Sequence, residues 1–253
     1  MTATVPNPQK PQKVGGHVIE WIELPADFVL PDDPVENEAQ PLLAAALTDA
    51  LGQVPSLMES ALVVSNFALC ASVDGRMICK APDWMYVSPV EPSATIRRSY
   101  TPHIKGPVPQ VVMEFLSESD CGEYSMQSGR KIGKWYFYER IIKVPTYVIF
   151  DPASGELEVH ALSDGRYERK ELSADGRYFI ADLGLWVGVW EGTRNSYTGF
   201  WLRWWTADGE LVLWSEEWAK EAEAQAKEAE AWAQMAEAEN AKLLAKLKAA
   251  GLE

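Results

Sequence analysis

The chain has 253 residues, of which 47% are hydrophobic and 24% charged, and its formal net charge is −14. This hydrophobic share is enough for a substantial core, in one large domain or in one domain with appendages. The sequence has no run of about 20 uncharged apolar residues, which excludes a membrane span, and residues 1–16 lack the apolar stretch of a signal peptide. Three cysteines without a close pair and three separated histidines argue against a disulfide framework or a zinc module, so we expect a cytoplasmic protein.

The charge is unevenly distributed along the chain, which matters for nucleic-acid binding. An acidic protein is a poor ligand for a polyanion, because phosphate contacts require clustered Lys and Arg. Residues 76–150, however, carry ten basic and seven acidic side chains and have a basic balance. The candidate contacts to a nucleic-acid backbone in this segment are Arg97, Arg98, Lys105, Arg130 and Lys131. A locally mixed surface is the alternative interpretation of the same pattern.

The first two thirds of the chain combine an arm with an α/β pattern. Residues 1–40 contain six prolines and many acidic residues, which predicts a loosely packed, acidic N-terminal arm. Residues 41–162 are expected to form the core. Its predicted elements are a helix over 41–51 that starts with proline, strands over 62–72 and 77–87 joined by a turn at Asp74-Gly75, a strand over 111–116, an amphipathic helix over 130–142, and strands over 146–150 and 156–162.

Residues 163–214 have the pattern of a Trp-rich antiparallel β extension. Turn signals occur at Asp164-Gly165 and Asp175-Gly176, and six tryptophans follow between Trp186 and Trp214. One interpretation is that the rings form a platform for a sugar or a base. The other is that they pack as core at the open end of the sheet, as large aromatic side chains usually do.

The C-terminal residues 215–253 contain a heptad repeat. Four seven-residue units rich in Ala, Glu and Lys follow one another over residues 219–246. A period of seven predicts one long helix, which we expect over residues 215–248. Trp218 and Trp232 lie on one stripe of this helix and suggest self-association. Most other positions of the stripe are small or polar, so a weak coiled coil and a solvated single helix are both compatible with the pattern.

Two carboxylates lie inside apolar strands of the predicted core. Asp83 follows Pro82 in an aromatic strand, and Glu114 lies within the run VVMEFL of residues 111–116. Burying a carboxylate is costly unless a cation or a donor compensates it, and two such strands side by side would favour a divalent metal ion. Lys134 lies on the helix that follows, where an ammonium group could stabilise charge that develops on a phosphate.

Each of these three residues also has an ordinary structural interpretation. Asp83 could cap an adjacent turn, and Lys134 could lie on a solvated helix face. Glu114 could pair with Arg97 or Arg98. On the residue pattern alone, both interpretations stay open.

Four motifs along this segment together resemble those of the Uma-two family. They are Pro82-Asp83, the strand VVMEFLS of residues 111–117, Lys134 followed four positions later by Tyr138, and KVPTYVIFDP of residues 143–152. The resemblance covers roughly residues 60–162. It implies an α/β fold of the restriction endonuclease-like, PD-(D/E)XK superfamily, with a central mixed β-sheet flanked by helices. The antiparallel β extension and the long C-terminal helix lie outside this resemblance.

The resemblance also implies a function, namely a metal-dependent endonuclease that hydrolyses phosphodiester bonds of DNA. Asp83 and Glu114 would be ligands of Mg²⁺ or Mn²⁺, with the Phe115 carbonyl as a third ligand. Lys134 would be the catalytic lysine, which in this family lies on the helix. Lys131 is the competing lysine. We prefer Lys134, because it has the family spacing to Tyr138 and is expected within the regular part of the helix, whereas Lys131 is expected at a frayed start.

Two departures from the family pattern support a second hypothesis. Ser117-Glu118-Ser119 replaces the family's Ser-Pro-Ser, and the predicted first helix offers only Asp49 as an acidic residue. The second hypothesis is a catalytically inactive endonuclease-fold protein that acts as a binding or assembly module through the Trp-rich region and the C-terminal helix. The charge of −14 favours it, whereas the complete carboxylate and lysine set favours the enzyme. A homodimer assisted by the C-terminal helix is compatible with both.

Overall fold

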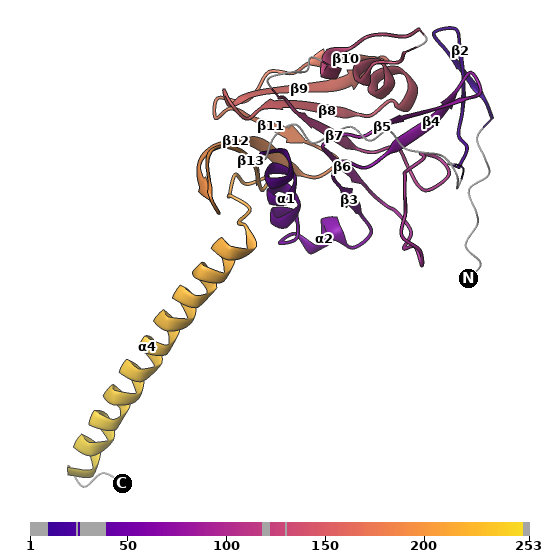
Figure 1. Ribbon diagram of the computed structural model, residues 1–253. Coiled ribbons are helices and arrows are strands. Elements are labelled where there is room, and N and C mark those ends of the chain that lie inside the picture. The colour runs from indigo at the N-terminus through magenta and orange to yellow at the C-terminus, as the bar shows by residue number, and fades with distance from the viewer. Residues whose placement is uncertain (1–9, 24, 26–38, 118–121, 130, 250–253) are drawn as a thin grey trace. The chain divides into compact units, whose positions relative to one another are not determined.

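The computed structural model describes residues 10–23, 25, 39–117, 122–129 and 131–249 (Figure 1). The chain divides into two compact units, residues 1–212 and residues 213–253. Among the described residues, no helix has both the length and the apolar character needed to cross a membrane.

A mixed six-stranded sheet with the strand order β10-β9-β8-β7-β6-β3 forms the centre of the first unit (Figure 1). Its strands are β3 (Leu62–Val64), β6 (Trp84–Val87), β7 (Val111–Phe115), β8 (Thr146–Asp151), β9 (Glu156–Ser163) and β10 (Arg166–Arg169). Strands β7 and β8 are parallel, and the other neighbours are antiparallel. A parallel pair requires a crossover connection. This one contains the 3₁₀-helix η1 (Gly122–Tyr124), the short helix α3 (Lys134–Tyr136) and the π-helix η2 (Phe137–Ile142).

Both faces of the central sheet are covered, which explains why β7 is a continuous buried run rather than an alternating one. On one face, Val112 and Ile149 belong to a core cluster that includes residues of η2 and of a second sheet. On the other face, the Trp84 indole donates a hydrogen bond to Thr48 of the helix α1 (Ala39–Leu51), at 2.9 Å. Because side chains alternate along a strand, Glu114 lies on the same face as Val112, toward η2.

The second sheet has the strand order β1-β2-β4-β5. Its strands are β1 (Gln12–Val14), β2 (His17–Glu20), β4 (Leu69–Val73) and β5 (Arg76–Lys80). Residues 12–20 were expected within a loosely packed arm, but they form a hairpin that pairs with β4. Ile19 of this hairpin is buried in the core, so burial of its apolar side fixes a segment that its composition alone would leave loose.

The strands expected over 62–72 and 77–87 each turn out to be two strands in two different sheets. The predicted turn at Asp74-Gly75 is present between β4 and β5, and both of its residues have positive φ. The outer parts of the two segments, β3 and β6, pair within the six-stranded sheet instead. The chain changes sheet at Asn66, which has a φ of 46° and donates a backbone hydrogen bond to the carbonyl of Pro82.

From β11 onward the Trp-rich region forms an antiparallel three-stranded sheet, as its sequence predicts, whereas β10, at the start of the expected extension, belongs to the six-stranded sheet. Its strands are β11 (Arg177–Ile180), β12 (Leu185–Arg194) and β13 (Tyr197–Trp205). Helix α1 occupies the segment where the predicted helix was placed and is followed by the short helix α2 (Pro55–Met58). Trp204 of β13 is fully buried, donates to the carbonyl of Leu47 in α1 at 3.1 Å, and contacts the ring of Trp84. These contacts agree with the packing interpretation of the tryptophans.

The second unit is dominated by one long helix, α4 (Ser215–Ala249), which confirms the helix predicted over 215–248. Glu223 and Lys227 form an i,i+4 ion pair at 2.7 Å. Trp218 and Trp232 are 57% and 65% exposed. The helix is therefore stabilised by its own backbone and side-chain pairs, and it presents the tryptophans to solvent.

Candidate active site

Glu114 is a fully buried carboxylate on the central strand β7. Its Oε1 accepts a hydrogen bond from the Tyr138 hydroxyl at 2.8 Å, and its Oε2 accepts one from the Lys134 ammonium at 3.1 Å. Burial raises the pKa of Glu114 to about 8, while the charge of Lys134 opposes this shift. A carboxylate at this position is stabilised by one charged and one neutral donor, and any further negative charge nearby would require a cation.

Asp83 provides that further negative charge. It lies directly before β6, and the antiparallel pairing of Trp84 with Met113 places it beside Glu114 on the neighbouring strand. Its Oδ2 accepts the backbone N–H of Phe115 at 2.6 Å. Burial raises the pKa of Asp83, and the Phe115 N–H and Lys134 counteract this effect. The side-by-side arrangement of the two carboxylates agrees with the expectation from the sequence.

Lys134 is the first residue of α3 and lies between two glutamates. Its Nζ is 3.1 Å from Glu114 Oε2 and 3.2 Å from Oε1 of Glu123, which belongs to η1. Burial lowers the pKa of Lys134, but the charges of Glu114, Glu123 and Asp83 outweigh burial and raise the pKa above its usual range. Lys134 is thus a cation at any physiological pH and is not on a solvated helix face.

The predicted start of this helix at residue 130 is wrong. Gly133 has an extended backbone and precedes the first helical residue, Lys134, while Ser128 and Ile132 form an isolated β-bridge. Lys134 therefore does not lie in the regular part of a helix, and the argument that preferred it to Lys131 on that ground fails. The contacts with the carboxylates nevertheless distinguish the two lysines, because Lys131 is exposed and precedes the helix.

The alternative partners considered for the carboxylates are not the ones found. Glu114 pairs with Lys134 and not with Arg97 or Arg98. Asp83 joins the neighbouring strand through Phe115 rather than capping an adjacent turn. The Phe115 carbonyl, expected as a metal ligand, accepts a hydrogen bond from the Gln40 amide of α1 at 3.1 Å. A carbonyl oxygen has two lone pairs, so this bond leaves one of them for another partner.

Glu123 is a site residue that the sequence did not reveal. It lies in the polar segment between β7 and α3, where several acidic residues occur without a periodic pattern. Its side chain is only 8% exposed, and its backbone carbonyl accepts a hydrogen bond from the buried Tyr147 hydroxyl at 3.0 Å. One of its carboxylate oxygens, Oε2, is buried and has no hydrogen-bond partner among the described residues. Glu123 is buried by contacts with α3 and β8, which are distant in sequence. The residues around it in the sequence therefore do not indicate that its charge is buried.

The chemistry of this cluster fits a hard divalent cation. Its donors are carboxyl oxygens, and its three acidic side chains outnumber the single ammonium of Lys134. The described part of the chain contains no group of three or more His, Cys, Asp or Glu side chains arranged around one metal position. Mg²⁺ commonly uses only one or two carboxylates together with water and substrate phosphate. The pair of Asp83 and Glu114, with the unpartnered Glu123 oxygen nearby, fits such an ion.

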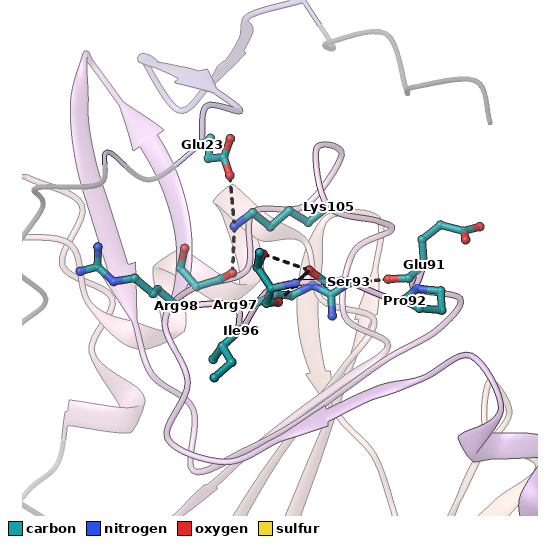
Figure 2. A pocket seen from close by; sticks show the side chains of 10 residues that line it. Glu23, Glu91, Pro92, Ser93, Ile96, Arg97, Arg98 and Lys105 are labelled. Carbon is teal, nitrogen blue, oxygen red and sulfur yellow. Dashed lines mark hydrogen bonds and ion pairs between the residues drawn. The ribbon is translucent and has the colours of Figure 1, made fainter. Parts of the chain in front are cut away.

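Three of the basic residues expected to contact nucleic acid line a cavity that does not include the carboxylate site. Arg97, Arg98 and Lys105 line a cavity of about 430 Å³ together with the acidic residues Glu23 and Glu91 (Figure 2). Lys105 donates to the Ser99 carbonyl at 3.3 Å and lies 3.6 Å from a Glu23 carboxylate oxygen, and Arg97 donates to the Glu91 carbonyl. None of the carboxylates or the lysine of the buried site lines this cavity. Arg130 lies outside the described residues.

The central sheet is mixed, has one parallel pair at its centre and is flanked by helices. Together with two carboxylates on adjacent strands that meet Lys134 of α3, this arrangement defines a restriction endonuclease-like protein. Comparison with protein families agrees: residues 27–193 match the model of the Uma2 family, whose description is "Putative restriction endonuclease". The chain belongs to this family. The match extends on both sides beyond residues 60–162, where the motifs lie, and includes β11 and most of β12. A comparison with curated proteins gives no match.

Proposed function

We propose that this protein is a Mg²⁺- or Mn²⁺-dependent endonuclease that hydrolyses phosphodiester bonds of DNA. One observation carries the proposal: two carboxylates on adjacent strands converge with the half-buried ammonium group of Lys134. A structural ion pair would need one carboxylate for one lysine, whereas this cluster places three acidic side chains around Lys134, of which Glu114 and Glu123 are buried and Asp83 is half-buried. Keeping three neighbouring carboxyl groups ionised is costly in an apolar interior, and burial accordingly raises the pKa of Glu114 and of Asp83. A bound divalent cation would offset this cost, and phosphodiester hydrolysis uses such a cation.

Each site residue has a role in this proposal. Asp83 and Glu114 would hold the cation, with the Phe115 carbonyl as a further ligand. A divalent cation bound there would neutralise the scissile phosphate and lower the pKa of a water molecule. Lys134 would stabilise the charge that develops on the phosphate oxygens, because its ammonium is fixed between two carboxylates. Tyr138 would hold Glu114 in orientation through its hydroxyl.

Binding of the substrate would depend on the surface cations. Arg97, Arg98, Lys105 and Lys131, with Arg130, would contact phosphates without reading base sequence. Such contacts release counterions, so DNA affinity should fall steeply with salt. A cytoplasmic location belongs to the same proposal.

Cleavage of supercoiled plasmid tests the proposal directly. The purified protein with Mg²⁺ or Mn²⁺ should convert plasmid to nicked or linear forms, and EDTA should stop the reaction. Glu114→Ala is expected to abolish cleavage, with wild-type circular dichroism as the check on folding. Glu158→Ala, which alters an acidic residue of β9, is the matched control and should cleave normally. Plasmid conversion that is equal in the wild type and Glu114→Ala would refute the proposal.

A second candidate function is an inactive endonuclease-fold module that assembles through its Trp-rich region and its C-terminal helix. The observation that favours it is the exposure of Trp218, Trp232 and Leu243 on α4, where solvated side chains would be expected to be polar. We propose that this face supports a homodimer through a weak coiled coil. Dimerisation is compatible with either function, so the plasmid assay and not the oligomeric state distinguishes the two.

A further inference from the structure

The buried oxygen of Glu123 requires an explanation beyond the ion pair with Lys134. Oε1 contacts the ammonium at 3.2 Å, whereas Oε2 is buried and finds no partner in the part of the chain that the structure describes. A carboxylate oxygen only accepts hydrogen bonds, and a buried acceptor without a donor costs free energy. Such an atom marks a place where a donor or a cation belongs.

The position of Glu123 is fixed by the fold and not by a flexible loop. The Tyr147 hydroxyl of β8 holds its backbone carbonyl, and Gly133 N–H donates to the carbonyl of Gln127 at 2.9 Å. A Cβ atom at Gly133 would lie 2.0 Å from the Ser125 carbonyl oxygen. The backbone of the segment after η1 therefore lies against the residue directly before Lys134. This close approach brings the Glu123 carboxylate to the lysine.

We propose that Glu123 is a positioning residue of the candidate active site: its Oε1 holds the Lys134 ammonium beside Glu114, and its Oε2 adds a third negative charge to the cation site of Asp83 and Glu114. This inference rests on the proposed function. The three carboxylates do not surround one point, so Glu123 acts on the cation through its hydration shell and its charge. Residues of this kind around metal sites typically contribute about 10–100-fold to metal affinity or activity.

Two measurements that do not depend on cleavage test the inference in Glu123→Gln, which keeps the shape of the side chain. The first is the acetylation rate of individual lysines, measured by mass spectrometry. Lys134 should be acetylated several-fold faster in the variant, because one of its two anionic partners is gone, while Lys105 and Lys131 should keep their rates. The second is calorimetric titration with Mn²⁺, where the affinity should fall about tenfold.

The matched control is Glu139→Gln. Glu139 is also buried and also pairs with cations, Arg140 and Arg166, but it does not contact Lys134. It should change neither the Lys134 rate nor the Mn²⁺ affinity. Tyr147→Phe is the second variant, because it releases the Glu123 carbonyl without altering a charge, and it should raise the Lys134 rate by a smaller factor.

An unchanged Lys134 rate in Glu123→Gln would overturn the positioning role, and an unchanged Mn²⁺ affinity would overturn the contribution to the cation site. These outcomes are separate from a failure of the proposed function. A protein that binds Mn²⁺ and shows the predicted acetylation pattern but leaves DNA intact would refute the nuclease and support the assignment of Glu123.

Discussion

Strand β7 and helix α4 are the two extremes of burial in this chain. All five residues of β7 are buried, including the carboxylate of Glu114. Along α4, the described side chains are exposed, apart from Glu217 and Ala222, which are half-buried. Both segments have clear sequence patterns, a short apolar run in the first and a heptad repeat in the second. The side chains of β7 have specific neighbours in the core, whereas most of the described side chains of α4 face solvent.

This difference shows that the energetic contribution of a charged residue depends on its burial. In the interior, Glu114 has two specific donors, because a carboxylate without them would be too costly to bury. On α4, the Glu223–Lys227 pair is solvated, and such pairs contribute only a few tenths of a kcal/mol, about 0.3–0.5 for i,i+4 pairs. We therefore expect large effects from changes at the buried cluster and small ones from changes at exposed charges.

The largest expected effect comes from replacing Lys134 with alanine, and the same replacement of the exposed Lys131 serves as the comparison. Lys134→Ala should abolish cleavage, with a loss of at least about a hundredfold, because it removes a fixed charge from the site. Binding of Mn²⁺ should persist, since Asp83 and Glu114 remain. Lys131→Ala changes an exposed residue only three positions away. It should leave the rate at saturating DNA unchanged and weaken DNA affinity, with a smaller dependence on salt.

Plasmid cleavage at saturating protein, with DNA affinity measured at several salt concentrations, separates these effects. The contrast between the half-buried and the exposed lysine would break down if Lys131→Ala lost turnover while Lys134→Ala lost only affinity. That result would assign Lys134 to DNA binding and Lys131 to catalysis.

The second prediction concerns the exposed face of α4, where the expected effect is a factor of two in mass. Full-length protein should behave as a dimer in light scattering, and a variant that ends at residue 214 should be monomeric. The physical reason is the stripe with Trp218 and Trp232, whose burial between two helices removes large apolar areas from water. Trp232→Glu in the full-length chain should also give a monomer, whereas Lys227→Glu should not. A monomeric full-length protein would exclude self-association.

Local sequence patterns decide which features of this molecule could be predicted. The strand with Glu114, the adjacent Asp83 and the long C-terminal helix were predictable, because an apolar run and a seven-residue period are local patterns. The convergence of Glu114 with Lys134 was anticipated from spacing and from the family resemblance. For the strand and the helix, neighbouring residues already contain the information, whereas the convergence of Glu114 with Lys134 required the family resemblance.

Three features were not predictable, because contacts distant in sequence determine them. Leu62–Val64 and Leu69–Val73 lie in different sheets, since each has its own strand partner. The start of α3 depends on the close approach of Gly133 to Ser125. The burial of Glu123 depends on Tyr147 and Lys134. No local pattern distinguishes this glutamate from the solvated acidic residues of the same chain.

The smallest expected effect concerns a surface ion pair, that of His17 on β2 and Asp74 in the turn after β4. His17 Nδ1 lies 2.7 Å from Asp74 Oδ2, and Nε2 lies 2.7 Å from the carbonyl of Ser128. Both partners are acceptors, so both ring nitrogens donate only when the imidazole is protonated. The hydrogen bond with Asp74 raises the pKa of His17, and the same bond lowers the pKa of Asp74, while Arg76 weakly opposes the shift of His17.

These shifts give the pH dependence of the hairpin formed by β1 and β2. The contribution of His17 is complete below its unfolded pKa, about 6.5, and is lost as pH rises through the higher folded value. The contribution of Asp74 is complete above about pH 4 and is lost as pH falls through its lower folded value. Amide exchange of the hairpin, corrected for intrinsic rates, should therefore be slowest at about pH 5–6 and faster at pH 8. In His17→Gln this difference should vanish, while the amides of β7, which His17 does not contact, should keep equal protection at both values in both proteins. Equal protection of the hairpin at pH 6 and pH 8 in the wild type would show that the exposed pair contributes nothing, and the contrast with the buried cluster would then be sharper than proposed.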